Sequence, residues 1–209
     1  MVSTDEELVP GLAIAETSKP QGDQSPYRHF IEACENLNIY NAQTIINKML
    51  TCDYILANYD RHYRNFGAIR NIETLKWVKF APLYDSGSSL WAKTPTAEIP
   101  FNEYKAKPFK TDPLQQFYLV NDLTWLDENK LVGFEKEIST ILKQNYLMDE
   151  QRISAISKQV EKRVKKVIER KRELEPDLLK KASSKITEIE KEIEKVEQYK
   201  NFQEINKNK

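Results

Sequence analysis

Strand-like patterns occur together in one short stretch of this chain, and helical patterns lie on both sides of that stretch. Residues 65–71 and 75–84 are short runs with branched and aromatic side chains, and the polar link between them predicts a hairpin. In several segments before and after this stretch, apolar residues recur at spacings of three and four, which is the period of a helix. We therefore expect a mainly α fold in which helices surround one short β-hairpin.

The strongest helical pattern near the N-terminus covers residues 41–58, and Asn41 can cap its first turn. An earlier helix is expected over 27–38, directly after Pro26, where helices often begin. After the hairpin, further helices are expected over 114–121, 127–145, 149–174 and 177–203.

The last expected helix, 177–203, has a coiled-coil-like seam. Its apolar residues alternate at spacings of three and four, and most other positions are Lys or Glu. This pattern predicts a long, charged, amphipathic helix that packs on its own domain or pairs with the preceding helix. The alternative is a helix that mediates self-association or binds a partner. The seam consists of Leu179, Ala182, Ile186, Ile189, Ile193 and Val196.

The pattern predicts three parts along the chain. Prolines and glycines interrupt residues 1–26, which we interpret as an irregular connector. Residues 27–175 form the main helical domain, and residues 176–209 form the charged C-terminal helix. Within the domain, the proline-rich segment 91–113 is expected to be a long loop.

Composition excludes several kinds of site. The chain has only five glycines, and none are spaced as in the glycine-rich loops that bind phosphates. Two cysteines and two histidines are too few for a zinc site built from Cys and His. Cys34 and Cys52 both lie in expected helices, so we interpret them as reduced thiols of the core.

Charge and hydropathy narrow the expected location and partners. Lys and Arg number 32, as do Asp and Glu, so the formal net charge is zero and provides no global attraction to nucleic acid. The basic run at 158–172 is interrupted by glutamates, and we interpret it as a solvated helix face rather than a nucleic-acid site. With no apolar run long enough for a membrane span and no apparent signal peptide, we expect a cytoplasmic protein without a membrane partner.

The residues with recognisable chemistry are Asp60, His62, Asn65 and Asp85. Phosphoryl transfer requires one carboxylate that faces the attacking hydroxyl, and a second carboxylate with an amide oxygen to hold magnesium against the phosphates. Asn65 follows Asp60 by five residues, as in the catalytic loop of protein kinases, and Asp85 follows the expected hairpin. We therefore expect Asp60 to act as the base, with Asn65 and Asp85 as magnesium ligands. His62 can orient the loop or assist proton transfer.

Each of these residues, considered alone, is more often structural. A single Asp after a helix is commonly a cap or turn residue, and Asp-Ser-Gly, as at 85–87, is commonly a turn. Only the combination of residue types, order and spacing favours phosphoryl transfer.

The two motifs resemble those of a known family. The D-x-H-x-x-N loop at 60–65 and the A-P-L-Y-D segment at 81–85 are similar to the catalytic loop and metal motif of HipA-like Ser/Thr kinases of bacterial toxin–antitoxin systems. The resemblance covers roughly residues 27–170 and implies a kinase C-lobe that is mostly helical.

The same resemblance implies specific roles and ligands. Asp60 corresponds to the catalytic aspartate, and Asn65 and Asp85 correspond to the residues that bind Mg²⁺ and, through it, ATP. The implied substrate is Ser or Thr of a protein, for example one of the translation machinery, and an antitoxin or a chain that carries the N-lobe is an implied partner. A related alternative is the catalytic loop of phosphatidylinositol 3- and 4-kinases. Those enzymes have Asp-Phe-Gly at the metal motif, where this chain has Asp85-Ser86-Gly87.

The sequence departs from a complete kinase before the catalytic loop. Kinases have an N-lobe whose strand lysine grips the phosphates, and no lysine in a strand-like segment precedes Asp60. We therefore expect that the chain alone transfers phosphate poorly and that the N-lobe comes from elsewhere, for example from a partner chain. An alternative of another class is an inactive, kinase-derived module that binds other proteins.

Overall fold

The computed structural model describes residues 4–101 and 104–176. The chain divides into two units, residues 1–168 and 169–209. Residues 169–176, the described part of the second unit, are helical. The expected helix 177–203 and its seam lie outside the described residues. The following paragraphs concern the first unit.

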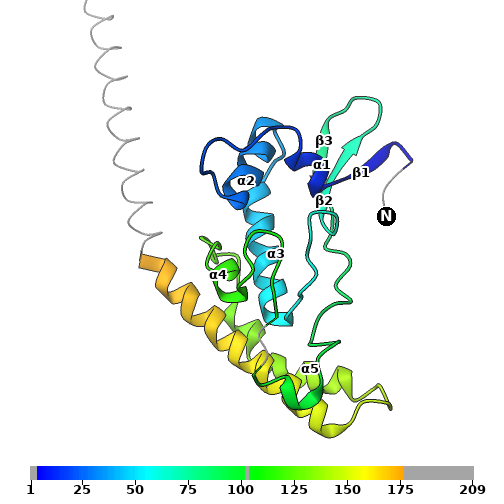
Figure 1. Cartoon of the computed structure of the whole chain (residues 1–209), viewed down its shortest axis with the longest axis vertical. Helices are drawn as coiled ribbons and strands as arrows, with labels where there is room; N and C mark the ends of the chain where they lie inside the picture. The colour runs from blue at the N-terminus through cyan, green and yellow to red at the C-terminus, as the bar shows by residue number, and fades with distance from the viewer. Residues whose placement is uncertain (1–3, 102–103, 177–209) are drawn as a thin grey trace, which may run out of the picture. The chain divides into compact units, whose positions relative to one another are not determined.

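A small antiparallel sheet lies at one end of this unit (Figure 1). It contains β1 (Glu6–Pro10), β2 (Gly67–Asn71) and β3 (Trp77–Phe80), in that order across the sheet. The β2–β3 pair is the hairpin that the sequence predicts, although β3 ends at Phe80, so residues 81–84 are not part of a strand.

The first strand was not expected. The sequence predicted an irregular segment over residues 1–26, and this is wrong for residues 6–15, which form β1 and the short helix α1 (Gly11–Ala15). Pro10 is at the end of an edge strand, where its missing N–H breaks no ladder. Gly11 allows close approach to the next segment, since a Cβ there would lie 2.9 Å from the ring of Phe66. The residues that suggested irregular structure are therefore those that join a strand to a helix.

Two helices lead from this sheet to the centre of the unit. The helix α2 (Pro26–Asn36) has Pro26 in its first turn, as predicted, and the hydroxyl of Ser25 accepts a hydrogen bond from the backbone N–H of Arg28. The helix α3 (Ala42–Leu56) matches the strongest predicted pattern. Asn41 occupies the position before α3 but adopts a left-handed conformation, and its side chain makes no capping hydrogen bond, contrary to our expectation.

The region after the sheet contains less regular helix than the spacing predicts. The expected helices 114–121 and 127–145 are reduced to α4 (Pro113–Phe117), the 3-10 helix η2 (Glu128–Leu131) and α5 (Phe134–Leu142). The proline-rich segment after the metal motif is irregular except for the 3-10 helix η1 (Thr96–Glu98). The chain becomes helical again from residue 150, close to the predicted start.

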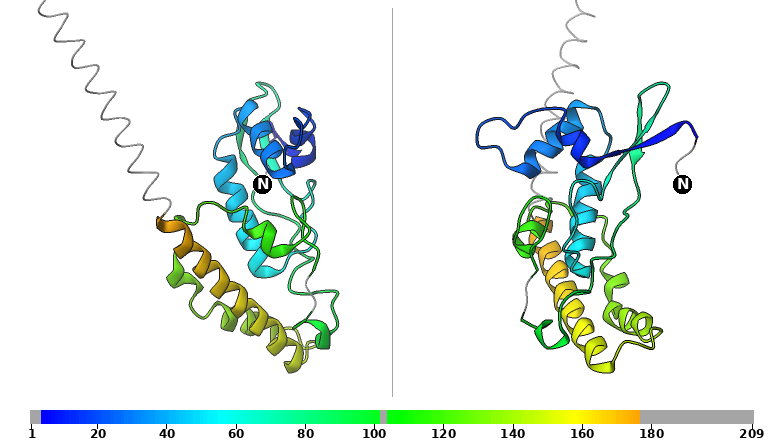
Figure 2. Two further views of the ribbon diagram at one scale, coloured as in Figure 1. Left: turned by 60° about the vertical axis from the view of Figure 1, so that its left-hand side comes forward. Right: turned by 45° about the vertical axis from the view of Figure 1, so that its right-hand side comes forward.

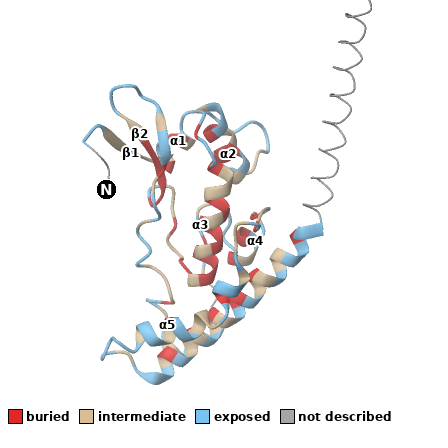
Figure 3. Cartoon of the chain, turned by 180° about the vertical axis from the view of Figure 1, so that it is seen from behind, coloured by how far each residue is buried: buried red, intermediate tan, exposed pale blue. Residues whose placement is uncertain are grey.

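The core is built along α3, whose buried residues form an almost continuous stripe in Figure 3. Ile46, Met49 and Leu50 are at most 1% exposed, and burying such a side chain contributes about 1.5–3 kcal/mol to folding. The helix that starts at residue 150 contributes the buried Val160 and Val164. None of the described helices is long and apolar enough to cross a membrane.

The arrangement places two connecting segments beside α3. The chain leaves the end of α3, returns toward the sheet through residues 57–66, and after β3 runs back along α3 toward α5 (Figures 1 and 2). Backbone hydrogen bonds join the two segments, from Tyr59 N–H to the carbonyl of Ser88 at 3.2 Å and from Leu90 N–H to the carbonyl of Leu56 at 2.7 Å. The predicted catalytic loop and the predicted metal motif therefore lie side by side.

Candidate active site

The loop after α3 is fixed to the end of that helix. Ala57 ends α3 in a left-handed conformation. Asn58 is 1% exposed, and its amide donates to the carboxylate of Asp53 at 2.9 Å while its carbonyl oxygen accepts from the N–H of Asp60 at 3.2 Å. Asp60 is therefore positioned by the helix terminus rather than by a free turn.

Arg61 connects the predicted catalytic loop to the predicted metal motif. Its side chain is fully buried and forms two hydrogen bonds with Asp53, from Nε at 2.9 Å and from Nη2 at 3.0 Å. Nη1 donates to the backbone carbonyls of Asn65 and Tyr84, and Nη2 donates to the hydroxyl of Ser86 at 3.1 Å. One guanidinium group thus binds the backbone of one predicted metal ligand and both neighbours of the other, Asp85.

This ion pair is costly to break because both of its side chains are buried. Desolvation raises the pKa of Asp53, and the hydrogen bonds from Arg61 and Asn58 act in the opposite direction. A buried carboxylate that lost its cation would be costly, so Asp53 and Arg61 need each other in the folded state. Arg61 stands at a variable position of the D-x-H-x-x-N loop, so the sequence did not indicate this role.

Asn65 is buried, and its amide is oriented by the loop itself. Its side-chain nitrogen donates to the backbone carbonyl of Asp60 at 2.9 Å, and its backbone N–H donates to the carbonyl of His62 at 2.8 Å. Because the nitrogen end of the amide is used internally, the oxygen is the end suited to bind a cation.

Asp60 is paired with a lysine that the sequence did not indicate. The ammonium group of Lys107 lies 2.7 Å from Asp60 Oδ1, and the two side chains are 50% and 38% exposed. The hydrogen bond from Lys107 lowers the pKa of Asp60 below its ordinary value, so this carboxylate is ionised at neutral pH. The two residues are 47 positions apart in the sequence, and no local pattern relates them.

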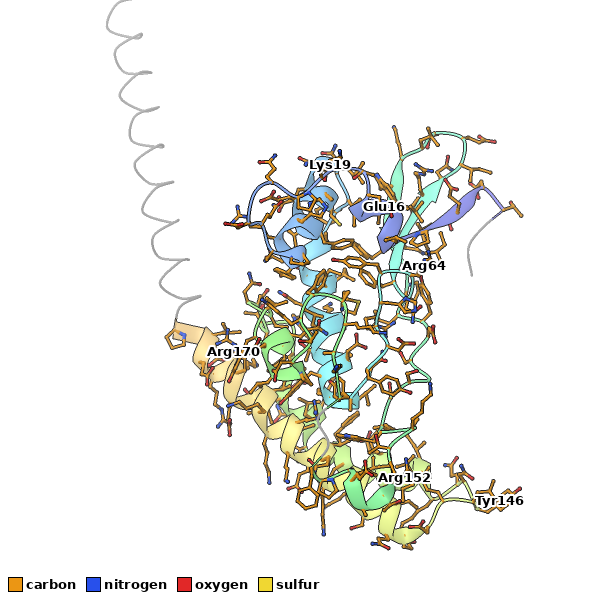
Figure 4. The ribbon with its side chains drawn as sticks, viewed as in Figure 1. Glu16, Lys19, Arg64, Tyr146, Arg152 and Arg170 are labelled. Atoms are coloured by element: carbon orange, nitrogen blue, oxygen red, sulfur yellow. The ribbon has the colours of Figure 1, made fainter. Side chains whose placement is uncertain are left out.

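His62 is placed to orient the loop. Its backbone N–H donates to the carbonyl of Asp60 at 2.8 Å, and its ring Nδ1 accepts from the N–H of Arg64 at 3.3 Å. Figure 4 shows Arg64 where the loop approaches the sheet. These contacts do not involve the carboxylate of Asp60, and the orienting role of His62 stays a prediction.

Asp85 stands at the exposed edge of the site. Its backbone is in the left-handed region, with φ of 54°, a conformation that costs a non-glycine residue roughly 1–2 kcal/mol. Arg61 holds the residues on both sides of it, and the hydroxyl of Tyr84 donates to the carbonyl of Arg64 at 3.0 Å. The residue is thus fixed by its neighbours and is itself exposed.

The residue types present fit a magnesium ion that is shared with phosphate. Within residues 4–101 and 104–176 there is no group of three His, Cys, Asp or Glu side chains that could hold a metal. A site of one carboxylate and one amide oxygen is not of that type, because bound phosphate supplies the remaining oxygen ligands. Asp85 and Asn65 suit such a site.

A pocket of about 360 Å³ opens directly beside Asp60. Its walls are formed by Tyr59, Lys93, Thr94, Tyr104, Lys105 and Lys107. Tyr59 precedes the D-x-H-x-x-N loop, and the other five residues come from the proline-rich segment 91–113, which has no motif. The sequence therefore did not indicate this pocket.

Comparisons with known proteins show a likeness in structure rather than in sequence. No protein-family model matches this chain, and no curated protein matches its sequence. Its structure is similar to the crystal structure of CtkA, a proinflammatory kinase of Helicobacter pylori, with a TM-score of 0.54. The two chains are 17% identical, and the match covers 83% of this chain and 74% of CtkA. The chain therefore has a kinase-like fold, mainly helical with a small antiparallel sheet.

Proposed function

We propose that this chain is the C-lobe of a Ser/Thr protein kinase of the HipA-like type, which transfers a phosphoryl group from ATP with the help of Mg²⁺. The observation that supports this most directly is the set of hydrogen bonds from Arg61 to Asn65, Tyr84 and Ser86. They bring together the two motifs that phosphoryl transfer needs, although these are separated in the sequence by the hairpin.

In this proposal each residue has a distinct task. Asp60, ionised and exposed, orients the hydroxyl of the acceptor and accepts its proton. Asn65 and Asp85 would hold Mg²⁺, which neutralises charge on the phosphates when it is bound. His62 and Arg61 keep the loop in position, which matters because positioning and electrostatic stabilisation provide most of the catalysis in phosphoryl transfer.

The test is calorimetry of ATP binding to the full chain, with and without magnesium. We expect binding that requires magnesium and is lost in Asp85→Asn. Asp23→Asn is the matched control, since Asp23 is an exposed carboxylate far from the motif in sequence, and it should bind as the unchanged chain does. Binding that requires neither magnesium nor the carboxylate of Asp85 would contradict the proposed metal site.

A second candidate is a kinase-derived module that binds other proteins. The observation in its favour is that residues 4–59 contain one strand, β1, and that β1 has no lysine to grip the phosphates. If ATP at millimolar concentration does not bind, this candidate gains, unless a partner that carries an N-lobe restores binding. An antitoxin and self-association through 177–203 are further proposals. Light scattering of the chain with and without residues 177–209 tests the latter.

Transfer itself is tested by mass spectrometry after incubation with Mg-ATP and a candidate N-lobe partner. Asp60→Asn should abolish incorporation of phosphate and leave nucleotide binding largely intact, because Asp60 faces the acceptor rather than the metal. Retained incorporation in Asp60→Asn would refute its assignment as the base.

A further inference from the structure

Among the described residues that line the pocket beside Asp60, three are cations and none is acidic. Lys93, Lys105 and Lys107 contribute the positive charge, and Tyr59 and Tyr104 contribute aromatic surface. Lys93 lies over the ring of Tyr59, with Nζ 5.7 Å from the ring centroid. Such a combination favours a ligand that has a negative group at the end of a short apolar stem.

The lysine next to Asp60 stands on a rigid support. Gln116 of α4 is 4% exposed, and its side chain donates to the backbone carbonyl of Lys107. The oxygen of the same amide accepts from the backbone N–H groups of Phe109 and Lys110, at 3.0 and 3.2 Å. The segment that presents Lys107 is therefore fixed before any ligand arrives.

The opposite wall is held by the helix that starts at residue 150. Arg152, which Figure 4 labels, donates to the backbone carbonyls of Trp91 and Thr94 at 2.7 and 2.8 Å and so fixes the turn that presents Lys93. Arg163 is 6% exposed and lies 5.1 Å from the ring centroid of Tyr104. Both walls thus have their positions set from the interior.

The position of the pocket indicates which reactant it would meet. Neither predicted metal ligand, Asn65 or Asp85, lines it, whereas the nucleotide phosphates must lie against the metal. The pocket instead adjoins Asp60 through Lys107, and Asp60 is the residue that faces the acceptor hydroxyl. The pocket therefore lies on the acceptor side of the site.

We propose that this pocket binds an acidic side chain, Asp or Glu, of the protein substrate, close to the Ser or Thr that receives the phosphoryl group. This inference rests on the proposed function and narrows its substrate to Ser or Thr in an acidic sequence context. Lys93 and Lys105 attract the substrate carboxylate, and the tyrosine rings cover its methylene groups. Lys107 remains paired with Asp60.

The experiment measures peptide binding without nucleotide or metal, so it does not depend on catalysis. Two fluorescein-labelled peptides of equal length carry a central serine, flanked by glutamates in one and by glutamines in the other. Fluorescence anisotropy with the full chain should show roughly tenfold tighter binding of the acidic peptide at low salt, and the difference should shrink at high salt because exposed charges are screened. Equal affinity for the two peptides would overturn the proposal.

A matched pair of double variants distinguishes binding in the pocket from non-specific attraction by the charge of the whole chain. Lys93→Gln with Lys105→Gln should remove the preference for the acidic peptide. Lys76→Gln with Lys79→Gln changes the net charge equally at exposed positions of the β2–β3 hairpin and should keep the preference. Equal loss in both variants would mean non-specific attraction and would overturn the proposal.

Two further measurements identify which ligand the pocket binds, and they test this proposal separately from the proposed function. If ATP without magnesium displaces the acidic peptide, and the pocket variant no longer binds ATP, the pocket holds nucleotide phosphates and the proposal is wrong. The peptide preference should persist in Asp85→Asn. Peptide preference without ATP binding, also when a partner that carries an N-lobe is present, would retain the acidic-segment site and reject the kinase. ATP binding without peptide preference would retain the kinase and reject the pocket.

Discussion

Arg61 and Asp53 form a buried, two-point ion pair, with Nε and Nη2 of the arginine 2.9 and 3.0 Å from the two carboxylate oxygens. Asp53 belongs to α3, and Arg61 begins the part of the loop that leads to Asn65. The pair therefore connects the most buried helix with the residues that carry the proposed chemistry, so fold stability and site geometry depend on the same contact.

Replacing Arg61 by lysine should cost about 3–5 kcal/mol of unfolding free energy, because lysine cannot make the paired hydrogen bonds and leaves Asp53 buried with an incomplete partner. Urea denaturation followed by circular dichroism measures this. Arg64→Lys, in the same loop but exposed, should change stability by no more than about 0.5 kcal/mol. Similar losses in the two variants would show that Arg61 has no special role.

The pKa of Asp60 should rise when Lys107 is replaced by glutamine, since Lys107 is the main cause of its lowering. A carboxylate with a depressed pKa stabilises the fold above its unfolded pKa, and this contribution disappears as the pH falls through the folded pKa. Both side chains are exposed to screening, so at neutral pH Lys107→Gln should cost less than about 1 kcal/mol.

Carbon-13 NMR titration of the carboxyl group of Asp60 measures this shift. Lys105→Gln is the control, since Lys105 lies in the same segment without a hydrogen bond to Asp60, and it should leave the titration nearly unchanged. A pKa that stays low in Lys107→Gln would contradict the ion pair.

Arg163 should be among the most sensitive positions of the helix that starts at residue 150. Its guanidinium carbon lies 4.6 Å from the ring centroid of Tyr54 and 5.3 Å from that of Trp91, and Nη1 donates to the backbone carbonyl of Tyr54 at 2.9 Å. Arg163→Ala should lose more than about 2 kcal/mol and alter tryptophan fluorescence. Lys162→Ala, at the exposed neighbouring position, should do neither. A tolerated Arg163→Ala would remove the argument that this arginine fixes the wall of the pocket.

The thiol of Cys34 should resist alkylation in the native protein. Its side chain is fully buried, and desolvation raises its pKa to about 12, so the reactive thiolate is scarce at neutral pH. Mass spectrometry after brief treatment with iodoacetamide at pH 8 should find Cys34 modified only in denaturant. Rapid modification of the native chain would contradict the burial of α2.

The raised pKa of Cys34 also makes the free energy of unfolding depend on pH. The folded protein keeps the thiol proton at a pH where the unfolded chain has released it. The free energy of unfolding should therefore fall as the pH rises above the ordinary thiol value of 9.0 toward about 12.

The parts of the site that are close in sequence could be predicted, and the parts that depend on distant contacts could not. The spacing of Asp60 and Asn65 is a local property, and the structure adds the hydrogen bond that orients the amide. Lys107 contacts Asp60 only because α4 and Gln116 hold its segment against the loop. The sequence of the proline-rich segment 91–113 does not indicate that Lys107 lies close to Asp60.

The fold shows the same division. Helix α3 has a continuous apolar stripe and was predicted nearly to its ends, whereas β1 has no partner within its own part of the sequence. Its hydrogen bonds go to β2, with Glu6 opposite Asn71 and Pro10 opposite Gly67. Local propensity predicts that Pro10 and Gly11 interrupt regular structure. The long-range pairing of β1 with β2 instead decides the structure that they adopt.

The strand β1 and the turn after it also limit how many residues can be removed from the N-terminal side. The N–H of Gly11 donates to the carbonyl of Phe66 at 2.8 Å, and the N–H of Leu12 donates to that of Tyr63 at 2.9 Å. A fragment that started at residue 27 would lose both bonds and a third of the sheet's strands, and the ring of Phe66 would be left open to water. An N-terminal truncation for crystallisation or for fusion to a reporter should therefore begin no later than residue 6. A mechanical force applied through a tether fused just before β1 would act on the predicted catalytic loop through these hydrogen bonds.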